Sequence, residues 1–225
     1  SRLQRPRRPT REEIVAPLRA LRSTPGSPLR QHRSAVYWLE ELAQAGPAAL
    51  PAIRQFLAGY EDIELDTATL LQSRTPRDRI ALEFAVPPSL RLGMFEVVRR
   101  MGGPEAFAIL GESLGATGRG IEVSYLATAL QEMGPNQHRE KILEVARALL
   151  AQPGPSNATS PLDRNHRDYL FGVLAMFGDT GFVTEAQTQL VRTDSQIDRS
   201  ALKYLQQVLG PQSVPLAVSA YQNPL

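Results

Sequence analysis

The sequence predicts an all-α fold, built from antiparallel pairs of helices that follow one another as a short, irregular α-solenoid. Apolar residues recur at three- and four-residue spacing through most of the 225 residues, as on the buried face of a helix. Alternating Val, Ile and Thr runs are missing, and so are the Asn-Gly and Asp-Gly dipeptides of tight hairpins. A Gly-Pro turn separates neighbouring helical stretches at four places, namely Gly46-Pro47, Gly103-Pro104, Gly134-Pro135 and Gly210-Pro211.

The chain begins with a basic arm, residues 1–11, in which prolines alternate with arginines. Such a tract is expected to be extended and solvated. It fits a passive tail, or an arm that contacts nucleic acid or an anionic membrane surface. No aromatic residue lies among the arginines to stack on a base, which weakens the nucleic-acid interpretation. The arginines of the arm are Arg2, Arg5, Arg7, Arg8 and Arg11.

Helix start signals follow the arm. Thr10 and Glu13 form a capping box before the apolar residues of a first helix. Ser27 is placed to cap a second helix, with Pro28 at its first position, that runs to Gly46. Thr75-Pro-Arg-Asp78 and Ser160-Pro-Leu-Asp163 repeat the same signal.

The Gly-Pro turns explain the pairing. Glycine ends a helix because it adopts the left-handed conformation without a Cβ clash, and proline then begins the next helix. Gly178-Asp-Thr-Gly181 occupies the equivalent place in a fifth pair. Apolar residues recur seven and four positions before several turns, and four, seven and eleven after some of them, so they are expected to face the core; they include Leu39, Leu42, Leu50, Ile53, Leu57, Phe95, Val98, Val214 and Tyr221. Because the turns are unevenly spaced, we expect insertions near 60–89 and 152–161.

The strongest copy of the pattern, Leu39–Leu57, reads LEELAQAGPAALPAIRQFL. It resembles HEAT-type repeats of the armadillo-like α-solenoids, and the resemblance extends over about residues 35–225. It implies a single helical-repeat domain over 12–225, with residues 10–33 and 211–225 as terminal caps. In that family the second helix of each pair commonly lines a concave face that binds proteins, and sometimes nucleic acids. The exposed polar positions of these second helices would be Arg54, Glu112, Glu144, Arg147 and Gln189.

Catalytic signals are weak. Gly111-Glu-Ser113-Leu-Gly115 matches the nucleophile-elbow string, but that elbow needs a preceding strand, and a helix is predicted here. Without cysteine the chain has neither a disulfide nor a thiolate site. None of its three histidines is followed by an acidic residue or a histidine three or four positions later, and all three are expected on the surface near helix starts.

Two further features have structural interpretations. The acidic run Glu61, Asp62, Glu64 and Asp66 lacks the EF-hand spacing and is expected to be a solvated insertion. Trp38, the single tryptophan, is expected in the core.

Taken together, these signals predict a non-enzymatic scaffold that binds a protein partner and needs no metal or cofactor. Nucleic-acid binding through the arm is the alternative, and a HEAT-type lyase or glycosylase is a third hypothesis. The strong preference for arginine over lysine, 23 to 2, is typical of a GC-rich bacterial genome. The sequence starts with serine, as a mature or excised fragment would, so we make no prediction of the compartment. The sequence does not predict the oligomeric state either.

Overall fold

The computed structural model describes residues 16–18, 28–65, 87–152, 160–192 and 196–222. Within these ranges the secondary structure is helical, with no strand and only isolated bridges between Glu64 and Ser89 and between Val191 and Ile197. The all-α prediction is therefore confirmed for the described part of the chain. The basic arm and the start signals at Thr10 and Thr75 lie outside it. No described helix is both long and apolar enough to cross a membrane.

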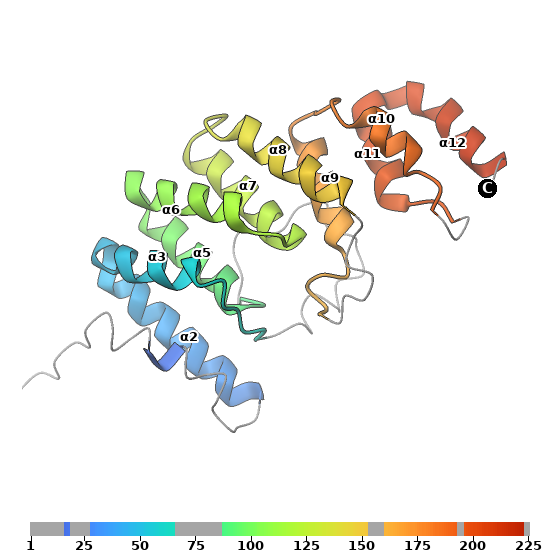
Figure 1. Ribbon diagram of the computed structural model, residues 1–225. Coiled ribbons are helices and arrows are strands. Elements are labelled where there is room, and N and C mark those ends of the chain that lie inside the picture. Colours follow the sequence, from blue (N-terminus) through green and yellow to red (C-terminus); the bar gives the residue numbers. More distant parts are fainter. Residues whose placement is uncertain (1–15, 19–27, 66–86, 153–159, 193–195, 223–225) are drawn as a thin grey trace, which may run out of the picture. The chain divides into compact units, whose positions relative to one another are not determined.

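The chain divides into two compact units, and each is described by itself. The first unit comprises Ser1–Thr69 and Glu83–Ser113. It contains α2 (Pro28–Ala45), the 3-10 helix η2 (Gly46–Ala49), α3 (Leu50–Ala58), α5 (Leu90–Met101) and most of α6 (Gly103–Ala116) (Figure 1). Helices α2 and α3 both pack against α5. The predicted inward positions of these helices are buried, among them Leu39, Leu42, Ile53, Phe95 and Val98.

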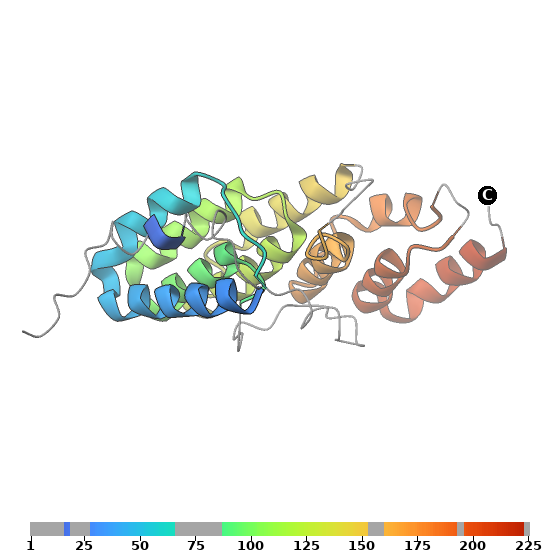
Figure 2. The same cartoon turned by 90° about the horizontal axis from the view of Figure 1, so that it is seen from below.

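The second unit comprises Leu70–Leu82 and Leu114–Leu225. Its helices are α7 (Gly120–Met133), α8 (Arg139–Ala151), α9 (His166–Met176), α10 (Val183–Thr188), α11 (Arg199–Leu209), the 3-10 helix η3 (Gly210–Ser213) and α12 (Val214–Gln222). Helix α9 lies between α7 and α11 and packs against both of them and against α8 (Figures 1 and 2). The core of the second unit includes Tyr125, Leu170, Phe171 and Tyr204.

The glycine turns match the prediction at most positions. Gly46, Gly178 and Gly210 have φ of +66°, +59° and +57°, in the left-handed region that glycine tolerates. The same prediction is wrong at Gly134, whose φ is −153°. In that turn the left-handed residue is Asn136, at φ +64°, since asparagine also tolerates this conformation.

The start signal at Ser160 is also misplaced, whereas α2 does begin at Pro28 as predicted. The main chain after Ser160 forms turns, and α9 begins only at His166. The Ser160 hydroxyl accepts a hydrogen bond from the N–H of Leu162 at 3.1 Å, so it stabilises a turn rather than a helix. The carboxylate of Asp163 binds the guanidinium of Arg119 instead of capping the segment.

Candidate functional site

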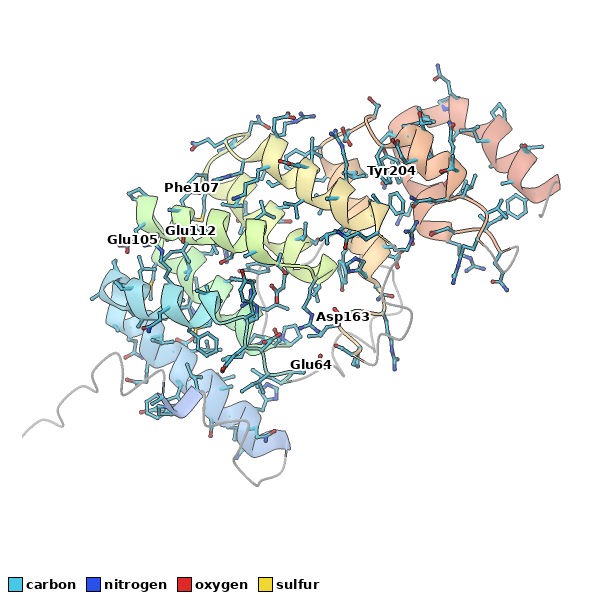
Figure 3. All side chains as sticks on the ribbon, viewed as in Figure 1. Glu64, Glu105, Phe107, Glu112, Asp163 and Tyr204 are labelled. Atoms are coloured by element: carbon cyan, nitrogen blue, oxygen red, sulfur yellow. The ribbon has the colours of Figure 1, made fainter. Side chains whose placement is uncertain are left out.

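Two of the predicted partner-binding residues bind each other in the first unit. Arg54 on α3 donates from Nε to Glu112 Oε2 at 3.0 Å and from Nη2 to Oε1 at 3.1 Å. Glu112 is labelled in Figure 3. Their side chains are 42% and 59% exposed, so this bidentate pair remains accessible on the surface. An exposed pair of this kind contributes little to folding.

Arg147 forms an ion pair within the second unit, which links α8 to the turn between α9 and α10. It makes a bidentate pair with Asp179, a buried residue in the turn between α9 and α10. The main-chain oxygen of Asp179 accepts a hydrogen bond from the Tyr204 hydroxyl at 2.8 Å, which links α11 to the same turn (Figure 3). Burial raises the pKa of Tyr204 to about 12. No pattern in the sequence indicated that Asp179 and Tyr204 would form these contacts.

Gln189 and Glu144 complete the predicted set. The side-chain oxygen of Gln189 accepts a hydrogen bond from Arg167 Nη2 at 2.9 Å. Glu144 is exposed on α8. Of the five residues, Arg54 and Glu112 contact each other in the first unit, whereas Glu144, Arg147 and Gln189 belong to the second unit. The arm residues predicted to bind an anionic partner lie outside the described residues.

A cavity of about 830 Å³ opens in the second unit, at the C-terminal end of α8 and the N-terminal ends of α9 and α11. We call it the arginine cavity, because four arginines and two aspartates line it. Gln189, Val191, Arg192 and Ile197, which follow α10, line another part of it. The charged lining residues are Arg164, Arg167, Arg192, Arg199, Asp168 and Asp198.

Both carboxylates of the arginine cavity are already bound within the chain. Asp198 caps α11 by accepting from the N–H groups of Ser200 and Ala201, and its other oxygen accepts from Arg167 Nε at 2.7 Å. Asp168 accepts a hydrogen bond from the hydroxyl of Ser200. The exposed Arg164 and Arg199, in contrast, have no such partner among the residues that the structure describes.

His166, the first residue of α9, also lines the cavity. It is only 8% exposed, so the prediction of a surface histidine is wrong at this position. Its Nδ1 accepts a hydrogen bond from the N–H of Gly120 at 3.0 Å, which leaves the proton of the neutral ring on Nε2. Burial is the main cause that lowers its pKa; the positive charge of Arg167 lowers it further, and Asp163 opposes both.

Other residues singled out in the sequence have structural roles. Ser113 is buried in α6, a helix as predicted, and its hydroxyl donates to the carbonyl of Ile109 at 2.9 Å. Asp62 is half-buried rather than fully solvated, and its Oδ1 accepts from the N–H groups of Ile63 and of Arg91 at the start of α5. Trp38 is half-buried rather than in the core.

The remaining acids of that run do not form a metal site in the described part of the chain. Asp66 lies outside it, and Glu64 is exposed. Among the described residues, no group of three or more histidine, aspartate or glutamate side chains is placed to hold a metal ion.

The last helix, α12, has an exposed apolar stripe. Val214, Val218 and Tyr221 are 59%, 47% and 69% exposed, and their spacing puts them on one face of the helix. The expectation that Val214 and Tyr221 would face the core is therefore wrong. The buried residues of this segment are Ser213 and Ala220.

Comparison with known proteins adds no assignment, because no protein-family model, curated protein or solved structure matches this chain.

Proposed function

We propose that the chain is a HEAT-like α-solenoid that serves as a non-enzymatic scaffold for a protein partner. Two observations support the repeat architecture. The helices follow one another in pairs joined by the glycine turns. The first helices of neighbouring pairs pack together, as α2 does with α5 in one unit and α9 with α7 and α11 in the other. Such contacts are how repeat proteins build a continuous core.

The main support for a protein-binding function is the exposed apolar stripe of α12. In the first pair the second helix, α3, buries the apolar residues at the same spacing after the turn, namely Leu50, Ile53 and Leu57. On α12 the side chains of Val214, Val218 and Tyr221 remain in water. Full burial of a large apolar side chain stabilises a complex by about 1.5–3 kcal/mol before the costs of association.

The chemistry of α12 indicates which partner surface would fit. The helix, VPLAVSAYQ, carries no charged residue. The complementary surface is therefore the apolar face of a partner helix, with the Tyr221 hydroxyl at the rim able to keep a polar contact.

The test is a capture experiment from lysate of the native host, with the full chain as bait and mass spectrometry as the readout. Val218→Glu places a charge in the stripe, whereas Ser219→Glu places the same charge on the neighbouring exposed position. We expect a defined protein to be captured by the wild type and by Ser219→Glu, and to be lost with Val218→Glu. Equal capture by both variants would show that α12 is not the binding surface.

Nucleic-acid binding through the basic arm is the alternative proposal, supported by the five arginines in residues 1–11. The same experiment separates it from the scaffold, if it includes a nuclease-treated sample and a bait that starts at residue 12. Capture that disappears with nuclease or with the arm, but survives Val218→Glu, would favour the alternative.

A further inference from the structure

We propose that the arginine cavity binds a phosphomonoester, that is, a phosphate group carried by an organic body. This inference goes beyond the scaffold function and does not depend on it, because it concerns α8, α9 and α11 and not α12.

The charge of the cavity favours a dianion. Four arginines against two aspartates leave an excess of two positive charges on the lining. Asp198 forms an ion pair with Arg167 and Asp168 accepts from Ser200, so neither carboxylate is hydrogen-bonded to Arg164 or Arg199. A phosphomonoester carries about −1.5 to −2 charges at neutral pH, which matches this excess. Guanidinium groups bind phosphate oxygens through paired hydrogen bonds.

His166 supplies a directed donor at the same place. Its Nδ1 is held by the N–H of Gly120, so the N–H at Nε2 lies on the opposite side of the ring, and it has no hydrogen-bond partner among the described residues. The side chain is more than nine-tenths buried and lines the cavity. The small part of the ring that is not buried leaves this N–H able to donate to an anionic acceptor in the cavity. The adjacent N-terminus of α9 has no side-chain cap, and its dipole also favours negative charge.

The size and the apolar part of the lining favour an organic phosphate over the free ion. A volume of about 830 Å³ lies in the range of cavities that hold organic ligands. Four lining residues offer apolar surface beside the arginines, and these are Leu150, Ala151, Val191 and Ile197. A ligand with both a phosphate and a carbon body would use both parts.

The experiment is isothermal titration calorimetry of the full chain at low salt. The probes are phenyl phosphate, adenosine 5′-monophosphate and a capped Gly-phosphoserine-Gly peptide, each with its unphosphorylated counterpart, together with inorganic phosphate. Tight binding of the peptide would indicate that the phosphate comes from a modified protein, and tight binding of the nucleotide would indicate a small molecule. Either result supports the cavity as a phosphomonoester site.

Variants locate the binding. Arg164→Gln with Arg199→Gln removes two exposed charges that have no carboxylate partner in the described part of the chain, and we expect at least about tenfold weaker binding. Arg33→Gln with Arg100→Gln removes the same charge from exposed positions in the first unit and should leave the affinity unchanged.

The histidine is tested by a matched pair. His166→Asn keeps an acceptor near Nδ1 but loses the distal donor, and should bind more weakly. His166→Gln keeps a donor near Nε2 and should bind better than His166→Asn. Three results would overturn the proposal: no saturable binding of any phosphomonoester, inorganic phosphate bound as tightly as the esters, or equal losses in the cavity variant and the control. Because none of these measurements involves α12, their failure would not affect the scaffold proposal.

Discussion

Because α7 and α9 approach each other closely, we expect alanine substitutions at two nearby glycines to change the stability of the fold in opposite directions. Gly120 begins α7, and a Cβ added to it would lie 2.5 Å from the carbonyl oxygen of His166 and 3.1 Å from its Cα. These are main-chain atoms, so no side chain can rotate away. Gly118, two residues earlier, has no atom within 4 Å of the added Cβ, and its φ lies outside the left-handed region.

The magnitudes follow from these distances. For Gly120→Ala, the two helix starts must move apart until the contact reaches at least 3.4 Å, where ordinary van der Waals contact begins. Overpacking of this kind costs about 1–3 kcal/mol. The movement also weakens the hydrogen bond from Gly120 to His166, which contributes about 1 kcal/mol. For Gly118→Ala, the loss of freedom in the unfolded chain should stabilise the fold by about 0.4–1 kcal/mol.

The assay is urea denaturation of the full chain followed by circular dichroism at 222 nm. We expect the free energy of unfolding to fall by about 2–4 kcal/mol for Gly120→Ala and to rise slightly for Gly118→Ala. A stability of Gly120→Ala equal to the wild type, or the same loss in both variants, would refute the close contact between α7 and α9.

Two further predictions concern pH. Because the folded state raises the pKa of Tyr204 from 10 to about 12, the folded chain holds this proton more tightly, and stability should fall as the pH rises from 10 through 12. Tyr204→Phe should lower the free energy of unfolding by about 1 kcal/mol near neutral pH and make its decrease at high pH smaller. Tyr221→Phe, at an exposed position, should change neither quantity. Urea titrations at pH 8 and pH 11 measure both. At acidic pH the change in stability depends on His166, whose pKa is lowered in the folded state. The unfolded chain therefore takes up the proton first, and the free energy of unfolding should fall as the pH drops through 6.5. His166→Asn should make this fall shallower between pH 7.5 and 5.5, although His138, whose pKa is lowered too, will leave part of it; an unchanged slope would contradict the buried neutral ring.

Local signals explain what could be predicted from the sequence. The inward positions before and after the turns, such as Leu42, Ile53 and Phe95, were predicted correctly because helical spacing alone sets which residues share a face. The left-handed glycines were predicted because proline follows most of them directly. The same Gly-Pro pattern gave a wrong prediction at Gly134. Asn136, two residues later, adopts the left-handed conformation there in its place.

The candidate site could not be predicted, because it depends on contacts between distant parts of the chain. The arginine cavity combines the ends of α8, α9 and α11 with the residues after α10. No local pattern distinguishes His166 from a surface histidine. Its burial results from Gly120, which lies 46 residues earlier and whose missing Cβ lets the two helix starts meet.

The arginines show why charge in a sequence does not by itself locate function. Arg119, Arg147 and Arg167 each bind an aspartate that lies 31 to 44 residues away, and these pairs join neighbouring elements of the second unit. Their charge is used within the fold, so a partner would have to compete with a half-buried or buried carboxylate for it. Arg164 and Arg199 look the same in the sequence but have no such carboxylate among the described residues. Once the internal pairs are set aside, the remaining positive charge beside His166 is what an anionic ligand can neutralise, which is why we place the proposed phosphomonoester site there.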